Sequence, residues 1–343
     1  MSFYDVIDNK VVDYCEIVTC LFEHCNLNCI FCPQDHNSIV GSSRKEILDK
    51  AQTISHYINN NTRSTDFSVH IMGGELFSDY WLQQNYIPIY TKFIKLIRNK
   101  VKPEKNVIFN FVSNLVFENH HLVREFLDAN DLKISISYDP HGRFNSYNST
   151  LFKQNVERFK DRIRMVSCVQ TYQNIKAIKH GDEYFDYLYS LFPVDWDHLL
   201  PSTGKKSDLA IMPRESEVLA FYKILIDKYP KCRNIEHFTN GKSENKMTCT
   251  RGNSLTIMPD GTIPTGCSGS VLLKEYNTED LGGTKIMENW VNKYNCFECD
   301  YFKRCPMSCF IKSDFKHLED DLPDCAFRLA FKYSDEKIKH SLR

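Results

Sequence analysis

The segment EHCNLNCIFC (residues 23–32) places Cys25, Cys29 and Cys32 on one short loop in a CxxxCxxC spacing. The loop follows CEIVTCLF (15–22), a β-rich run that predicts the first strand. Three thiolates on one short loop can hold three corners of an iron–sulfur cubane, whereas such clusters normally take four protein thiolates. The fourth iron then stays open for a ligand, like the open position of a catalytic zinc. The spacing alone also fits a zinc site, so other features of the chain must decide between the two.

The residues between the cysteines make this loop resemble the motif of the radical S-adenosylmethionine (SAM) superfamily. Asn26 and Leu27 follow the first cysteine, and the aromatic Phe31 precedes the last. The resemblance implies a [4Fe–4S] cluster whose open iron chelates the methionine amine and carboxylate of SAM. One electron then cleaves SAM to a 5′-deoxyadenosyl radical, which abstracts a hydrogen atom from substrate. By the same resemblance, Phe31 lies beside the adenine.

A Gly-Gly-Glu bend follows the second predicted strand, in the sequence IMGGELF. In the family this bend, here Gly73, Gly74 and Glu75, offers backbone acceptors to the SAM ammonium. Glycine permits the close approach that such contacts need. Taken by itself, Gly-Gly-Glu also fits a plain turn after a strand.

Two more strand ends carry polar residues in family-like positions. Ser113-Asn114 resembles the polar pair that meets the SAM ribose, which assigns Asn114 to cofactor binding. ISISYD resembles the Ser-x-Asp strand of the family, so that Ser137 is expected to contact SAM and Asp139 to face the cavity mouth. The alternative for Ser137 and Asp139 is ordinary strand-end capping.

The pattern from residue 15 to about 230 is an alternation of β-rich and helical segments. It predicts parallel strands with right-handed crossovers, in a barrel or a doubly wound sheet. Barrel enzymes build their sites at the carboxyl ends of the strands, where all these motifs fall. The resemblance covers about residues 15–200 and implies an α/β fold with a partial (β/α)6 TIM-like barrel. Strands are predicted at 15–22, 67–72, 106–113, 133–138, 164–171 and near 194–200, and helices at 43–59, 81–100, 118–130, 148–162 and 214–229.

Seven of the 14 cysteines lie between residues 249 and 325. After the first of them, Cys249, the segment SLTIMPDGTIPTGC predicts a hairpin that turns at 259–261 before Cys267. This region resembles the SPASM extension of radical SAM enzymes, except that five residues rather than four separate Gly261 from Cys267. The resemblance implies two auxiliary [4Fe–4S] clusters, one held by Cys296, Cys299, Cys305 and Cys325 and the other by Cys249, Cys267 and Cys309.

Two questions about the cysteines stay open in the sequence. Structural zinc is the alternative to auxiliary clusters, because CxxC pairs commonly bind zinc. The set with three thiolates has an open iron, or is closed by Cys232 or by a residue other than cysteine. Cys15, Cys20, Cys168 and Cys232 are otherwise interpreted as core residues, since cysteine packs as a small hydrophobe.

The predicted organisation is a radical SAM partial barrel at 1–233, a SPASM-like domain at 234–330 and a mobile tail at 331–343. About 14 residues precede the first strand, so we expect no leader-binding domain there. The formal net charge of -1 and the lack of a basic stripe argue against a nucleic-acid polymer as partner. No signal peptide and no run of about 18 apolar residues is present, which predicts a cytoplasmic protein that does not enter membranes.

The sequence therefore predicts a radical SAM oxidoreductase or maturase that modifies a peptide or protein side chain. The partners expected are that substrate and a reductant such as flavodoxin or ferredoxin. One alternative is radical oxidation or rearrangement of an aminoglycoside-like or nucleotide-like small molecule, and another is a non-catalytic zinc-binding interaction module. The base is not identified, and the acids and histidines near the rim are its candidates: Asp139, Asp195, Asp197 and His198.

Overall fold

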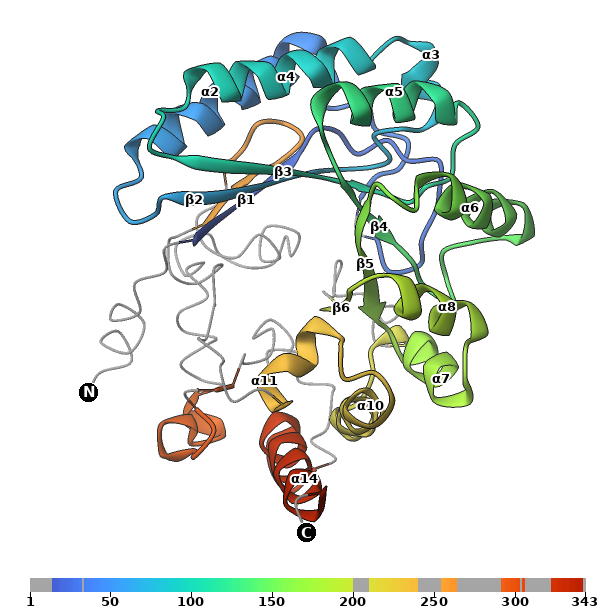
Figure 1. The fold of residues 1–343 in the computed structure, drawn as a ribbon, viewed down its shortest axis with the longest axis vertical. Helices are drawn as coiled ribbons and strands as arrows, with labels where there is room; N and C mark the ends of the chain where they lie inside the picture. The colour runs from blue at the N-terminus through green and yellow to red at the C-terminus, as the bar shows by residue number, and fades with distance from the viewer. Residues whose placement is uncertain are drawn as a thin grey trace.

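A curled sheet of seven parallel strands organises the chain in a computed structural model (Figure 1). The structure describes residues 14–32, 34–199, 210–239, 254–263, 291–302, 304–305 and 322–341. The spatial order is β6-β5-β4-β3-β2-β1-β7, so the first six strands follow one another in sequence. Their bounds are β1 Tyr14–Cys20, β2 Asp66–Met72, β3 Asn106–Ser113, β4 Ile134–Ser137, β5 Ile163–Gln170, β6 Val194–His198 and β7 Ser254–Ile257.

Helices cover the outer, convex face of this sheet (Figure 1). Alternate strand residues are buried against them; Trp196 of β6, for example, contacts Phe185 of α8 and Phe221 of α10. The helices described are α2 Arg44–Asn60, α3 Asp79–Gln83, α4 Ile87–Lys100, α5 His120–Asn130, α6 Ser146–Phe159, α7 Tyr172–His180, α8 Glu183–Leu191, α10 Glu215–Lys228, α11 Glu236–Thr239 and α14 Ala326–Ser341.

The predicted α/β partial barrel is confirmed, and all six predicted strands are present. The seventh strand, β7, lies in the segment that the sequence assigns to the C-terminal domain. It pairs in parallel with β1, from Glu16 opposite Ser254 to Thr19 opposite Ile257. Without β7, β1 would be an edge strand with unpaired backbone groups. The boundary predicted at residue 234 therefore does not separate the whole sheet from the rest of the chain.

The single helix predicted at 81–100 is instead two helices, α3 and α4. Asn85 between them adopts a positive φ of 57°, which ends the first helix. Pro88 stands in the first turn of the second, where a proline costs no hydrogen bond. The sequence interpretation also missed α7 and α8, which cross from β5 to β6.

The prediction of a mobile tail from residue 331 is wrong, because residues 326–341 form helix α14. Phe331 is fully buried and stacks on Tyr301, with ring centroids 4.8 Å apart. It also contacts Phe238, and α14 packs against α10 and α11. The C-terminal helix thus joins the end of the barrel segment to the cysteine-rich region.

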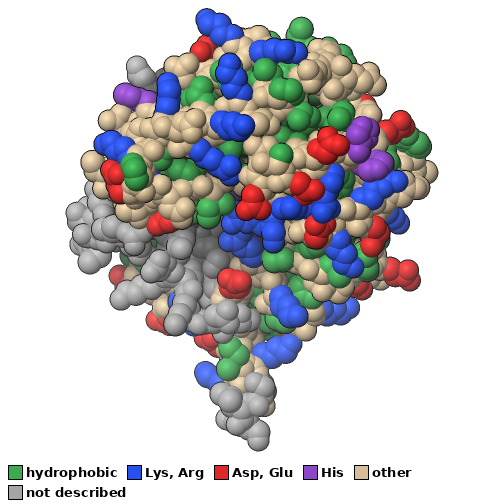
Figure 2. All heavy atoms as spheres, turned by 45° about the horizontal axis from the view of Figure 1, so that its top comes forward, with side chains coloured by type: hydrophobic (Ala, Val, Ile, Leu, Met, Phe, Trp, Pro, Cys, Tyr) green, Lys and Arg blue, Asp and Glu red, His purple; other side chains and the backbone are tan. Residues whose placement is uncertain are grey.

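Among the helices described, none is both long and apolar enough to cross a membrane. On the face shown in Figure 2, Lys and Arg side chains are interspersed with Asp and Glu. Arg124 and Arg162 form an ion-pair network with Asp128 and Asp161.

Candidate active site

The inner face of the curled sheet carries polar side chains. Glu16, His70, Asn110 and Ser135 come from four adjacent strands and contact one another in a row. His70 Nε2 lies 3.3 Å from Glu16 Oε1, and Asn110 Nδ2 lies 3.1 Å from His70 Nδ1. Ser135 donates to Asn110 Oδ1 at 2.9 Å. Closed barrels fill this position with branched apolar residues, so the polar lining fits a binding surface better than a packed core.

The cysteine loop follows β1 at the carboxyl end of the sheet, as the sequence predicts. Cys25, Cys29 and Cys32 lie close together, and besides burial the charges of Cys29 and Cys32 raise the thiol pKa of Cys25, while that of Cys32 raises the pKa of Cys29. Burial is the largest influence and raises the pKa of Cys25 to about 12. The backbone N–H of Leu27 and the Asn114 side-chain amide point at Cys25 Sγ, 3.4 Å and 3.8 Å away. Such donors are typical of cluster-bound thiolates.

The Gly-Gly-Glu bend lies directly against this loop. The N–H of Glu75 donates to the carbonyl of His24 at 3.1 Å, and Gly74 N–H donates to Gln34 Oε1 at 3.0 Å. Gly73 and Gly74 both have positive φ, 107° and 47°. A Cβ on Gly74 would come within 1.9 Å of the His24 carbonyl oxygen. Both glycines are therefore required by the contact between bend and loop.

The Glu75 side chain is fully buried and ties the bend to the end of β3. Its Oε1 accepts from Ser113 Oγ at 2.9 Å and from Phe77 N at 3.0 Å, and its Oε2 accepts from Asn114 N at 2.6 Å. Burial outweighs these donors and raises the pKa of Glu75 to about 7. The Asn114 amide in turn donates to Asn26 Oδ1 at 2.9 Å. Two predicted cofactor-binding segments are thus joined to the cysteine loop.

Phe31 lies among apolar residues at the open end of the sheet. It packs, together with Val169 of β5, against the small buried cluster of Leu199, Ile211 and Met212. An aromatic ring with aliphatic neighbours fits the flat apolar face of a nucleobase. The sequence interpretation did not single out these neighbours, because they come from three separated segments without a shared motif.

Arg143 is a second residue that the sequence interpretation missed. Its guanidinium lies over the Phe31 ring, 5.2 Å from the centroid, and Arg143 Nε and Nη2 are both 2.7 Å from Asp139 Oδ2. Burial raises the pKa of the Cys29 thiol, and the charge of Arg143 opposes this rise. A positive charge therefore stands beside the cysteine loop.

The structure corrects the expectation that Asp139 faces the cavity mouth. Its carboxyl is buried, and its Oδ1 accepts from Val169 N at 2.8 Å and from Asn174 Nδ2 at 2.7 Å. Burial raises the pKa of Asp139 to about 6, against the opposing effect of Arg143. With all these partners, Asp139 organises the strand ends instead of offering a free carboxylate. Ser137, at the end of β4, is half-buried.

The other three candidate bases lie on β6. Asp195 and Asp197 share the face opposite to Trp196, which is the inner face of the sheet. Asp197 reaches solvent, yet protein encloses it on most sides. This desolvation, with the charges of Asp195 and Asp139, raises the pKa of Asp197 to about 7. His198 ends the strand, with its ring 6.3 Å from that of Phe327.

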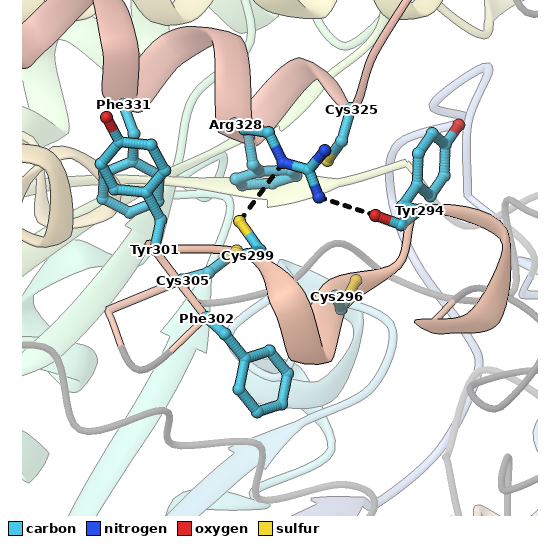
Figure 3. A pocket seen from close by; sticks show the side chains of 10 residues that line it. Tyr294, Cys296, Cys299, Tyr301, Phe302, Cys305, Cys325, Arg328 and Phe331 are labelled. Atoms are coloured by element: carbon cyan, nitrogen blue, oxygen red, sulfur yellow. Dashed lines mark hydrogen bonds between the residues drawn. The ribbon is translucent and has the colours of Figure 1, made fainter.

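Four predicted ligand cysteines come together in a second place (Figure 3). They line one small pocket with aromatic residues and Arg328, although they come from two segments separated in sequence. Burial raises the thiol pKa of Cys296 to about 12 and also raises that of Cys325. Four thiols around one pocket fit the donor set of a [4Fe–4S] cluster. These four residues are Cys296, Cys299, Cys305 and Cys325.

The remaining cysteines divide into three groups. Cys249, Cys267 and Cys309 lie outside the described residues, so the predicted second auxiliary site stays a prediction. Cys15, Cys168 and Cys232 are fully buried in the main core, as expected of structural thiols. Cys20, on β1, is half-buried.

Within the described ranges, no three His, Cys, Asp or Glu side chains converge as they would around a single metal ion. A cubane is held differently, because each thiolate binds its own iron atom and the four sulfurs surround the cluster. The three-cysteine loop and the four-cysteine pocket match that requirement in residue type and number.

Comparison with solved structures relates the whole chain to a known fold. Native anSMEcpe with bound AdoMet and Cp18Cys peptide matches with a TM-score of 0.65 at 18% identity, over 96% of this chain and 98% of that chain. Native anSMEcpe with bound AdoMet gives 0.66 at 17% identity, over the same shares. SuiB from Streptococcus suis bound to precursor peptide SuiA gives 0.53 at 14% identity, over 92% of this chain and 76% of that chain.

No protein-family model matches the chain, and no curated protein matches it in sequence. The similarity to anSMEcpe and SuiB is therefore a similarity of fold. Both are radical SAM enzymes with a SPASM-type extension, and this chain is similar to them in fold.

Proposed function

We propose that this chain is a radical SAM enzyme that modifies a peptide or protein side chain. The observation that carries the proposal is the cysteine loop at the carboxyl end of a parallel half-barrel. Three cysteines lie there beside a Gly-Gly-Glu bend, with Phe31 in an apolar cluster nearby. The chemistry that a bound cluster and SAM would supply is one-electron cleavage of SAM to a 5′-deoxyadenosyl radical, followed by hydrogen-atom abstraction.

The roles proposed for the protein residues are those that the resemblance to the radical SAM family implies, and the contacts between these segments support them. Cys25, Cys29 and Cys32 would hold three irons, and the fourth would remain open for SAM. Gly73, Gly74 and Glu75 would present backbone acceptors to the SAM ammonium. Asn114 and Ser137 would contact the ribose side of the cofactor, and Phe31 the adenine.

Asp197 is the best placed of the four candidate bases. It lies on the inner face of β6 and reaches solvent, whereas Asp139 is buried in an ion pair with Arg143. A base acts most effectively when its pKa lies near the working pH, and that of Asp197 is raised to about 7. Asp197 would accept the proton that substrate loses after hydrogen-atom abstraction.

A peptide substrate is supported by the two solved structures with bound peptides. Native anSMEcpe holds the Cp18Cys peptide, and SuiB holds its precursor peptide SuiA. The polar inner face, with Glu16, His70 and Asn110, offers hydrogen-bonding groups that suit a peptide. The four-cysteine pocket would add an auxiliary cluster that orients substrate or accepts its electron.

Iron content and SAM cleavage test this function directly. After anaerobic reconstitution, three [4Fe–4S] clusters would bring ~12 iron atoms per chain. Changing Cys25, Cys29 and Cys32 together to Ala should abolish dithionite-dependent formation of 5′-deoxyadenosine and remove about a third of the iron. Cys15→Ala is the matched control, because Cys15 is a buried thiol outside every motif. This variant should keep both the formation of 5′-deoxyadenosine and the iron content. Retained cleavage in the triple variant, or stoichiometric zinc with little iron, would refute the proposal.

The substrate class needs a separate measurement. Short peptides encoded beside the gene should raise the yield of 5′-deoxyadenosine and change in mass in proportion to it. An aminoglycoside or nucleotide that does so, where no peptide does, would contradict the peptide assignment while leaving the SAM chemistry intact.

A further inference from the structure

Arg328, in the first turn of α14, makes three directed contacts around the four-cysteine pocket. Figure 3 shows two of them, with Cys299 and Tyr294. Its Nε donates to Cys299 Sγ at 3.3 Å. Its Nη2 donates to the carbonyl of Tyr294 at 2.7 Å, and its Nη1 donates to Asp324 Oδ1 at 2.9 Å. One rigid guanidinium thus binds a thiol, a backbone carbonyl and a carboxylate.

The partners of Arg328 all belong to segments that carry the pocket's cysteines. Tyr294 lies two residues before Cys296, and Asp324 directly precedes Cys325. Asp324 Oδ1 also accepts from the N–H of Cys325 at 2.8 Å. Because the contacts of Nη1 with Asp324 and of Nη2 with Tyr294 hold the guanidinium, its Nε stays directed toward Cys299. A guanidinium is suited to this task, since its donors form a planar fork.

We propose that Arg328 raises the reduction potential of the auxiliary cluster held by Cys296, Cys299, Cys305 and Cys325. The inference rests on the proposed function, because it requires a cluster in this pocket. Reduction adds one electron to the cluster and increases the negative charge on its sulfur ligands. A cationic donor aimed at Cys299 Sγ stabilises the reduced form more than the oxidised form.

The electron is supplied by the cluster's donor, which is dithionite in the test, and Arg328 transfers no proton. Asp324 offsets part of the positive charge and so lowers the purely electrostatic effect of Arg328. The directed Nε–H to sulfur contact is therefore the main contribution, and a lysine cannot reproduce all three contacts. A cluster whose Cys299 ligand accepts this hydrogen bond takes up an electron more readily than a cluster without the arginine.

An EPR-monitored redox titration tests the inference on the full-length chain. Cys25, Cys29 and Cys32 are changed to Ala so that the signals come from the auxiliary clusters alone. In Arg328→Met the midpoint of one cluster should fall by ~59 mV, which corresponds to an about tenfold loss of preference for the reduced form. The other auxiliary cluster, assigned to Cys249, Cys267 and Cys309, should keep its midpoint and serves as an internal reference.

Lys332→Gln is the matched control. Lys332 carries the same charge on the same helix and lies 3.7 Å from Asp324 Oδ2, but it is not among the residues that line the pocket. It should leave both midpoints unchanged. Arg328→Lys keeps the charge and should lower the midpoint in the same direction by less than Arg328→Met. If the methionine variant loses iron, the lysine variant at full iron content decides the question.

If an Arg328 variant with full iron content keeps both midpoints, this inference is overturned and the proposed function is unaffected. An equal fall in Lys332→Gln would also overturn it, because general surface charge would then explain the shift. Wild-type protein that binds zinc and no iron would overturn the proposed function together with the inference, so the two failures are distinguishable.

Discussion

The N–H of Glu75 donates to the carbonyl oxygen of His24 at 3.1 Å, and this bond places the glycine bend directly against the cysteine loop. His24 immediately precedes Cys25, so the bend fixes the backbone at the start of the three-cysteine loop. The same approach leaves no space for a side chain on Gly74. The Gly-Gly-Glu bend and the cysteine loop are therefore one packed unit.

Gly74→Ala tests that unit. The new Cβ would come within 1.9 Å of the His24 carbonyl oxygen, and the positive φ of 47° adds strain. We expect destabilisation by more than about 2 kcal/mol, and loss of iron from the Cys25 cluster because the loop must move. Urea unfolding and iron analysis measure the two effects.

Gly181→Ala is the control for Gly74→Ala. Gly181 also has a positive φ, 89°, but a Cβ there meets nothing within 4 Å. It should cost about 1 kcal/mol from backbone strain and leave the iron content unchanged. Equal effects of the two substitutions would show that the contact with His24 is unimportant.

Arg143→Met should expose the dependence of Asp139 on its ion pair. Both groups are largely buried, and loss of the guanidinium leaves the carboxylate without a charged partner. Breaking a buried pair typically costs about 3 kcal/mol or more. Adding Asp139→Asn to Arg143→Met should recover part of that loss, as thermal unfolding of the single and double variants would show. Additive destabilisation would mean that the two residues do not interact.

If Asp197 is the base, its raised pKa sets the pH dependence of product formation. Below its pKa of about 7 the carboxyl is protonated and cannot accept a proton. The rate should therefore rise about tenfold per pH unit up to about pH 7 and then level off. Asp197→Asn should lower product formation by about a hundredfold or more and remove this rise, while SAM cleavage continues.

Asp195→Asn provides the comparison, because Asp195 lies on the same strand and face but also near the positive charge of Arg233. It should keep the rise of the rate with pH, but the rise should level off at a lower pH than in the wild-type protein, because the charge of Asp195 helps to raise the pKa of Asp197. A profile that survives in Asp197→Asn would exclude Asp197 as the base.

Phe331→Ala tests whether the packing of α14 stabilises the region around the four-cysteine pocket. Phe331 is fully buried between Tyr301 and Phe238, and its removal should destabilise this region by about 3 kcal/mol or more. Iron bound by the four-cysteine pocket should fall with it, because α14 also carries Arg328. Ile338→Ala, at an exposed position on the same helix, should change stability by no more than about 0.5 kcal/mol and leave iron intact. If the two variants had the same stability and the same iron content, the packing of α14 would not stabilise this region.

The sequence by itself determined the features that are local along the chain. The CxxxCxxC loop and the glycine bend could be read from it because each is a short run of neighbouring residues after a strand. The six strands of the half-barrel were equally visible, since β-rich runs alternate with helical segments and each pattern depends only on residues a few positions apart.

Only the tertiary structure decided what depends on contacts between distant segments. β7 completes the sheet beside β1, and Gly41 has no room for a Cβ because one would lie 1.9 Å from the Pro259 carbonyl. Arg143 reaches Phe31, and Arg328 reaches Cys299, across stretches of chain that no spacing rule connects. Residues 331–343 looked like a polar tail because most of them are polar, and only the packing of α14 against Tyr301 shows that Phe331 is buried. Which side chains are buried, and which charged groups meet, depends at these places on contacts between distant segments, and local sequence patterns do not encode such contacts.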